Sequence, residues 1–232
     1  MDIKLLLAAI SPAFIILYIF YQHDHAHNKE PLSLLVKCFF AGVLSTLVSF
    51  LFSYPLGLAG INKGVEGAFY EAFFIAAIPE ELAKLIMLHL VISRSHAFDH
   101  YYDGILYAVC VSMGFAGLEN ILYVSQGGYS LAITRAIFSV PGHMLFAVPM
   151  GFFYSYAKFQ PSKKYYFLGL CLLMPIILHG TFDFGLMATG VLSKNEDVTA
   201  LLILVALLIF IIWMWRYGLK KIAHTKKINI EE

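Results

Sequence analysis

The sequence IPEELAK at residues 78–84 places two carboxylates and an ammonium group inside an apolar run that extends from about residue 68 to residue 92. A run of that length fits a helix that crosses a lipid bilayer, which needs roughly 20 mostly apolar residues. A charge at such a depth is costly unless it is paired or faces a water-filled cavity. Glu80, Glu81 and Lys84 therefore indicate a functional site within a membrane-spanning helix.

The rest of the chain is equally apolar. Of its 232 residues, 60% are hydrophobic and 13% are charged, and the mean hydropathy is +0.76. These values exclude an ordinary soluble domain. The net charge of +1 argues against nucleic acid as a partner. We expect an all-α, polytopic transmembrane bundle that forms a single domain over residues 1–232, with the lipid bilayer around it.

The length that a spanning helix needs fits the sequence about seven times. The expected spans are residues 4–21, 32–56, 68–93, 102–124, 131–157, 165–192 and 198–217, and short polar breaks separate them, one of them at residues 125–130. The helices that carry candidate site residues lie within residues 68–192. All three cysteines fall inside apolar runs, so a disulfide framework is not expected.

Basic residues near the ends of the expected spans predict the orientation, because cytoplasmic loops carry an excess of lysine and arginine. One side holds eleven of them and the other holds four, so the N-terminus is predicted to lie outside and the C-terminus in the cytoplasm. The larger set is Lys29, Lys37, Arg94, Lys158, Lys163, Lys164, Arg216, Lys220, Lys221, Lys226 and Lys227, and the smaller set is Lys4, Lys63, Arg135 and Lys194.

Ionisable residues on four expected spans fall at a similar depth. With a rise of about 1.5 Å per helical residue, Glu80, Glu81, His143 and His179 lie roughly 18 to 21 Å from the cytoplasmic ends of their spans, and Glu119 lies about 25 Å deep. A purely structural protein has no need for so many costly groups at one level. The sequence therefore predicts that four helices bring these side chains to one site.

Short spacings within single helices suggest how the groups are paired. Glu80 and Glu81 precede Lys84 by four and three residues, and Asp183 follows His179 by four, so each pair shares a helical face. Asp183 can then hold the His179 ring in one orientation. Adjacent helical residues point about 100° apart, which predicts that the two glutamates face different partners. The spacing favours Glu80 as the partner of Lys84 and Glu81 as a base.

Two chemistries fit this set of residues. In one, a glutamate activates water as a general base while histidines stabilise an oxyanion. In the other, His143, His179 and a carboxylate bind zinc and leave Glu80 or Glu81 as the base. The chain has no His-Glu-x-x-His motif, so no cofactor is predicted and zinc is left open. His23, His25 and His27 form a further tract that reads either as a metal-binding segment or as a polar cytoplasmic turn.

Four motifs, in order and each on its own expected span, resemble those of the PrsW family of intramembrane proteases, which belongs with the CAAX-prenyl and bacteriocin-processing proteases. The motifs are Glu80-Glu81-x-x-Lys84, Phe115-x-x-x-Glu119-Asn120, His143 followed by Gly151, and His179-x-x-x-Asp183.

The resemblance covers most of the chain and implies a multi-pass protease of the bacterial cell (inner) membrane. Such an enzyme cuts a membrane-anchored, single-span protein substrate, typically an anti-sigma factor in signal transduction. The resemblance further implies glutamate-activated water with assisting histidines, and leaves metal dependence open. In the related CAAX proteases the first glutamate of the motif does the chemistry, which corresponds to Glu80 here.

The leading hypothesis is therefore an intramembrane endopeptidase. Its expected catalytic residues are Glu80, Glu81, His143 and His179, and its expected supporting residues are Lys84, Glu119, Asn120 and Asp183. One alternative is a zinc-dependent intramembrane lipid amidase. Another is a proton-coupled transporter that uses the same groups as a relay, although the chain lacks the internal repeat that many transporters show.

Overall fold

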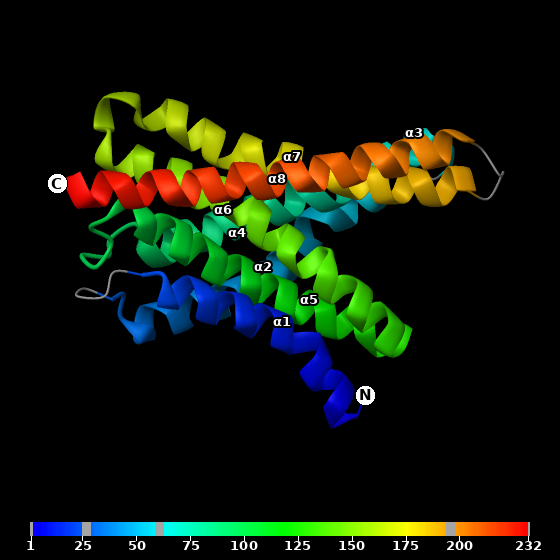
Figure 1. The fold of residues 1–232 in the computed structure, drawn as a ribbon, viewed down its shortest axis with the longest axis horizontal. Helices are drawn as coiled ribbons and strands as arrows, with labels where there is room; N and C mark the ends of the chain where they lie inside the picture. The colour runs from blue at the N-terminus through cyan, green and yellow to red at the C-terminus, as the bar shows by residue number, and fades with distance from the viewer. Residues whose placement is uncertain (1, 25–28, 59–62, 194–197, 232) are drawn as a thin grey trace.

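In the computed structural model, which describes residues 2–24, 29–58, 63–193 and 198–231, every regular element is a helix (Figure 1). This confirms the all-helical class. The elements are α1 (Ile3–Gln22), α2 (Leu32–Leu58), α3 (Gly64–Tyr70), the π-helical η1 (Glu71–Ala77), α4 (Ile78–Ile92), α5 (Tyr101–Ile137), α6 (Ser139–Phe159), the short 3-10 helix η2 (Pro161–Lys163), α7 (Lys164–Ser193) and α8 (Val198–Glu231).

Five described stretches are long and apolar enough to cross a membrane: Ile3–Gln22, Leu32–Leu58, Tyr101–Phe159, Pro161–Ser193 and Val198–Ile228. The third of these has 59 residues and contains both α5 and α6, so it is long enough to cross twice. The continuous helical stretch of α3, η1 and α4 is not among the five and carries five charged side chains. Seven crossings therefore stay a prediction.

The break expected at residues 125–130 is confirmed. Residues up to Ile137 are assigned to α5 and α6 begins at Ser139, but the backbone of Gly128 is not helical, with φ 66° and ψ −159°. The chain reverses there, because Arg135 returns to contact Glu119 and Asn120, 16 and 15 residues earlier. Glycine adopts this conformation without the steric penalty that a side chain brings. The last helix continues past its expected end at residue 217, to Glu231.

The IPEELAK segment begins α4 directly after a π-helical segment. Pro79 has no N–H, and its ring would clash with the carbonyl group four residues earlier in a regular α-helix. That carbonyl belongs to Ile75, which lies within η1, where the turn is wider. The wide turn thus accommodates Pro79 inside a continuous helical stretch, and it sets the direction in which Glu80 and Glu81 leave the backbone.

Helix α5 is the centre of the bundle, and nearly all of its residues from Tyr101 to Gly117 are buried. It packs closely on two neighbours at glycine positions. A methyl group at Gly114 would overlap the backbone of Phe39 in α2, and one at Gly151 in α6 would overlap the backbone of Gly104 in α5. Small residues allow helices in membranes to approach in this way. Close packing of α2, α5 and α6 fixes the positions from which the site residues project.

Figure 1 shows that the end of α1, the start of α2 and the connections after α4 and α6 lie at the same end of the long axis as the end of α8. Contacts between these segments agree: the Lys158 ammonium donates to the carbonyl group of Phe98, and the Tyr156 hydroxyl lies 2.9 Å from His224 Nε2. This is the set of segments that the basic residues assign to the cytoplasm. The sidedness itself stays a prediction.

Candidate active site

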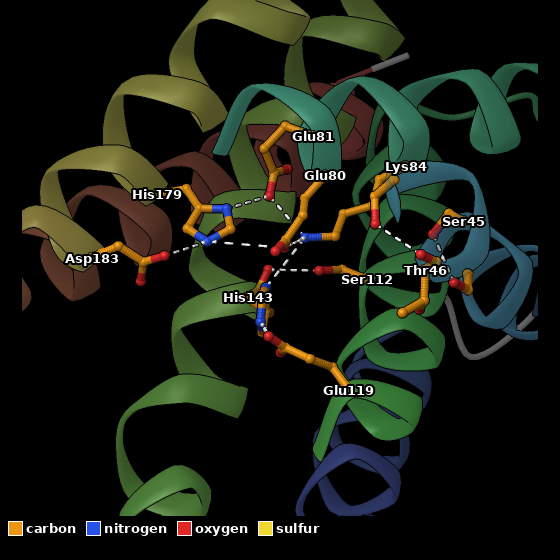
Figure 2. A network of polar contacts seen from close by, with 12 residues as sticks. Ser45, Thr46, Glu80, Glu81, Lys84, Ser112, Glu119, His143, His179 and Asp183 are labelled. Atoms are coloured by element: carbon orange, nitrogen blue, oxygen red, sulfur yellow. Dashed lines mark hydrogen bonds and ion pairs between the residues drawn. The ribbon is translucent and has the colours of Figure 1, made fainter. Parts of the chain in front are cut away.

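Four side chains from three helices converge inside the bundle (Figure 2). Glu80 and Glu81 come from α4, His143 from α6 and His179 from α7, and one donor atom of each lies within 4.8 Å of the others. Glu81, His143 and His179 are buried, whereas Glu80 is partly exposed. The structure thus brings together all four residues that the sequence predicts as catalytic.

Lys84 lies among these groups and contacts three of them. Its Nζ donates to Glu81 Oε1 at 2.8 Å, to Glu80 Oε2 at 3.3 Å and to His143 Nδ1 at 3.2 Å. The same ammonium group lies 3.9 Å from the centre of the Phe115 ring. The expectation that the two carboxylates face different partners is therefore wrong. Glutamate side chains are flexible enough to converge on one atom, even from positions about 100° apart.

These contacts fix the tautomer of His143. An ammonium group is only a donor, so His143 Nδ1 accepts and the ring proton lies on Nε2. That Nε2 donates to Glu119 Oε2 at 2.9 Å, and the Ser112 hydroxyl donates to the His143 backbone carbonyl at 2.8 Å. His143 is thus a neutral ring whose Nδ1 lone pair points into the cluster.

His179 is held between carboxylates on both sides. Its Nδ1 lies 2.9 Å from Glu81 Oε1, and its Nε2 lies 3.2 Å from Asp183 Oδ2 and 3.9 Å from Glu80 Oε2. The ring stacks on Phe146 with a centroid distance of 4.7 Å and an interplanar angle of 14°. Asp183 orients His179, as the spacing of four residues predicts.

Arg135 is a site residue that the sequence does not reveal, because a basic residue near the outer end of an expected span reads as a signal of topology. Its Nη2 donates to Glu119 Oε2 at 2.7 Å and its Nε donates to Asn120 Oδ1 at 2.6 Å. The Asn120 amide in turn donates to the Ala9 carbonyl in α1 at 2.6 Å. Asn120 is fully buried and supports the site indirectly, through Arg135 and Glu119.

The two adjacent glutamates differ in their access to the exterior. The Glu80 side chain is 15% exposed and the Glu81 side chain is 1% exposed. Glu80 and Glu119 line a cavity of about 380 Å³ between α2, α4 and α5. Glu81 is enclosed by Lys84 and His179 and does not line that cavity. Glu80 is thus the carboxylate of the pair that a molecule in the cavity would meet.

Among the described residues, Glu80, Glu81, His143 and His179 form one group that could hold a metal ion. Asp99, His100 and Asp103, at the start of α5, form the other. Of the histidine tract after α1, His25 and His27 lie outside the described residues. His23 Nδ1 lies 2.9 Å from the Ile19 carbonyl, at the end of α1.

The sequence profile of the family described as PrsW family intramembrane metalloprotease matches residues 30–214 of this chain. A protein named Protease PrsW from Geobacillus kaustophilus (strain HTA426) is 40% identical over 185 residues, which are 80% of this chain and 80% of that protein. Two other proteins of that name match more of the chain. The one from Oceanobacillus iheyensis is 34% identical over 98% of this chain and 100% of its own length. The one from Bacillus subtilis (strain 168) is 33% identical over 96% of each.

No solved structure matches the chain. The sequence matches nevertheless extend over nearly its whole length, and the matched region contains every residue of the cluster around Lys84. The chain therefore belongs to the PrsW family and is an intramembrane protease.

Proposed function

We propose that this protease hydrolyses a peptide bond in a single-span protein of the bacterial cell membrane, an anti-sigma factor being the substrate class that fits regulated proteolysis. Its site would lie in the interior of the bundle, with the N-terminus outside and the C-terminus in the cytoplasm. Membership of the PrsW family favours a peptide bond over a lipid amide as the target and favours hydrolysis over proton-coupled transport. The placement of Glu80 is the observation that carries the mechanism.

Glu80 serves as the general base. Its carboxylate belongs to the cluster of donors and also lines the cavity, so a water molecule in the cavity can reach it. Glu80 accepts a proton from that water as the water attacks the substrate carbonyl, and it then delivers the proton to the leaving amine. Glu81 is bonded to Lys84 and His179 and holds both of these side chains in place.

The histidines stabilise the negative charge that develops on the substrate oxygen. His179 Nε2 lies 3.9 Å from Glu80 Oε2, so its N–H is close to the position where the carboxylate activates water. The His143 Nε2–H and the Arg135 guanidinium group both donate to Glu119 at the wall of the cavity, so either group can serve an oxyanion only by exchanging that partner. Donors that are fixed before the reaction stabilise an oxyanion without a cost of reorganisation.

The family description implies a divalent metal, and the donors present fit one. Two carboxylates and two imidazoles lie within 4.8 Å of one another, and they are ligand types that zinc accepts. His143 donates its Nε2–H to Glu119, the partner that metal-binding histidines usually have, and its Nδ1 faces the cluster. Glu80, Glu81, His143 and His179 would hold the ion. When bound, it would act as a Lewis acid toward water and a substrate carbonyl.

Cleavage of a single-span reporter protein by the purified enzyme in liposomes tests the proposal. Glu80→Gln, Glu81→Gln, His143→Ala and His179→Ala are each expected to lower the cleavage rate by about 100-fold or more, because each removes a proton acceptor, donor or ligand. Full activity in all four variants would overturn the proposal.

Two substitutions on the same helical stretch serve as matched controls. Glu71→Gln changes an exposed carboxylate of η1, and His89→Ala removes an exposed imidazole of α4 whose Nδ1 lies 2.7 Å from the Tyr154 hydroxyl. Both variants are expected to retain cleavage within a small factor of the wild-type rate, because neither residue contacts the cluster.

A further inference from the structure

One buried hydroxyl group near the site has no hydrogen-bond partner. Thr46 in α2 is 1% exposed, and among the described residues its Oγ1 is the buried side-chain nitrogen or oxygen without a partner. A buried polar atom in this state is destabilising, and native structures keep few of them. Such an atom beside an active site suggests a partner that arrives with a ligand.

Neighbouring residues show that α2 could have satisfied this hydroxyl internally. Ser45 Oγ donates to the Gly42 carbonyl at 2.6 Å, and Ser49 Oγ donates to the Thr46 carbonyl at 2.8 Å. These are the local bonds by which serine and threonine usually satisfy themselves within helices. The Thr46 hydroxyl makes no such bond, and Thr46 is one of the residues that line the cavity shared by Glu80 and Glu119, all three of which are labelled in Figure 2.

The cavity is large and its composition is mixed. Its volume of about 380 Å³ lies within the range of roughly 300 to 1,000 Å³ that ligand pockets occupy. Its polar lining residues include Glu80, Glu119, Thr46 and Ser49. Phe50 of α2 and Leu122 and Tyr123 of α5 also line it, and each of these three is at least 41% exposed. Because these exposed side chains belong to α2 and α5, the cavity opens at the side of the bundle, between the two helices.

We propose that this cavity binds an extended segment of the substrate beside the scissile bond, and that Thr46 Oγ1 hydrogen-bonds to its backbone. The inference rests on the proposed peptidase function. A substrate helix must unwind to present a peptide bond, and its freed N–H and C=O groups need partners in an apolar environment. A threonine hydroxyl both donates and accepts, so it can pair with either group.

The charge of the lining favours a peptide over a lipid headgroup as the occupant. Two carboxylates line the cavity and would repel a phosphate group. The Arg135 guanidinium group, which lies nearby, is already bonded to Glu119 and Asn120. A neutral peptide backbone meets no such repulsion.

Thr46→Val tests the role of the hydroxyl, because valine keeps the shape and removes only the polar group. The wild-type and variant enzymes are compared for KM and kcat on the single-span reporter substrate, together with Tm in detergent without substrate. The variant is expected to raise KM about tenfold, to leave kcat within a small factor, and to raise Tm, because it removes an unpaired buried group. Thr46→Ser, which keeps a hydroxyl, is expected to restore KM.

Thr189→Val is the matched control. The Thr189 hydroxyl already donates to the Gly185 carbonyl in α7 at 2.8 Å and lines no part of the cavity. A purely structural role for Thr46 would change Tm in both variants and KM in neither. An unchanged KM in Thr46→Val would overturn the proposal.

Photo-crosslinking separates failure of this inference from failure of the proposed function. A photoreactive amino acid is placed at Leu122 or, as a control, at the exposed Leu201 of α8, in the inactive Glu81→Gln background. Crosslinks to the reporter substrate from residue 122 but not from residue 201 are expected. If residue 122 captures only lipid while the wild-type enzyme still cleaves, the cavity is not the subsite and the peptidase function stands. Capture without any wild-type cleavage would support the binding site and refute the function.

Discussion

The candidate active site and the start of α5 both gather acidic side chains with histidine, but they partner the acids differently. At the start of α5, Asp103 Oδ2 accepts from the backbone N–H groups of Asp99 and His100, at 3.1 and 2.7 Å. In the active site, Glu81 Oε1 is bonded to the side chains of Lys84 and His179, at 2.8 and 2.9 Å. The first cluster is a helix cap formed by five consecutive residues, whereas the second needs several helices to assemble.

This difference separates two uses of buried acids. A carboxylate that caps a helix has its partners supplied by the local backbone, so it stabilises one helix end. A carboxylate whose partners are side chains of other helices has those partners only in the folded bundle. Substrate, water or a metal can replace these partners. We expect substitutions in the two clusters to separate activity from stability.

The largest effect is expected for Glu81→Gln compared with Asp99→Asn. Glu81→Gln removes the negative charge that holds Lys84 and His179, and should lower the cleavage rate by about 100- to 10,000-fold. Asp99→Asn changes a half-exposed carboxylate at the α5 cap and should leave the rate within about twofold. Cleavage of the reporter substrate at equal amounts of folded protein measures both. Equal losses in the two variants would contradict the division between the clusters.

The second prediction concerns the overlap between Lys84 and the metal donors. Lys84 Nζ contacts Glu80, Glu81 and His143, which are three of the four candidate ligands. Lys84→Met removes a positive charge that competes with zinc for them. Zinc affinity, measured by calorimetry on purified protein, should rise by about tenfold or more, since each 1.4 kcal/mol of removed competition is a factor of ten.

Lys158→Met is the control for that experiment, because Lys158 donates to the Phe98 carbonyl at the far end of α6 and contacts none of the four donors. Its zinc affinity should equal that of the wild type. If the Lys84→Met variant binds zinc no more tightly than the wild type does, the lysine and the metal do not share ligands.

A third prediction uses Glu30, which precedes α2 and lies outside the spanning helices. Burial raises the pKa of Glu30 from 4.5 to about 7. The hydrogen bond that Glu30 accepts from the Tyr107 hydroxyl acts in the opposite direction and lowers this pKa. Between these values the folded protein holds a proton that the unfolded chain has lost. The free energy of unfolding should therefore fall as the pH rises through that window, by at most about 1.4 kcal/mol per pH unit.

Glu30→Gln should flatten this pH dependence and raise Tm above neutral pH, as thermal unfolding in detergent at several pH values would show. Glu66→Gln, which changes an exposed carboxylate of α3, is the control and should leave the profile of the wild type unchanged. A Glu30→Gln profile as steep as that of the wild type would show that another group carries the effect.

The smallest effect is expected at the α5 cap itself. Asp103→Ala leaves the N–H groups of Asp99 and His100 without their acceptor, and should lower the free energy of unfolding by about 1 kcal/mol. Cleavage per folded molecule should not change. A large loss of activity without a change in stability would place this cluster in the chemistry.

Much of this arrangement could be predicted from the sequence, because charged residues in apolar spans are few and their depth follows from counting along a helix. That reasoning brought Glu80, Glu81, His143 and His179 to one level, and the structure places them together. The break within residues 125–130 was predictable as well. The glycines at 127 and 128 interrupt the apolar run, and the chain reverses at Gly128.

Two site features depend on tertiary packing and left no local signal. Arg135 reaches Glu119 only because the chain reverses at Gly128 and brings residue 135 back beside residue 119. Thr46 resembles Ser45 and Ser49 in sequence, and only the missing hydrogen bond in the folded structure distinguishes its hydroxyl from theirs. A count of basic residues and a hydropathy plot contain neither relationship.

The π-helical turn of η1 sets how far α4 is rotated about the helix axis relative to α3. Helix α3, before the turn, contacts α7, and α4, after it, contacts α2. Each residue advances an α-helix by about 100°, and it advances a π-helix, whose turn is wider, by less. Converting Glu71–Ala77 to a regular α-helix of the same length would therefore rotate one half against the other. Glu80, Glu81 and Lys84 would keep their mutual spacing but would no longer face His143 and His179. A substitution that makes this segment α-helical, far from any reacting atom, would thus separate an intact ion pair from its histidines.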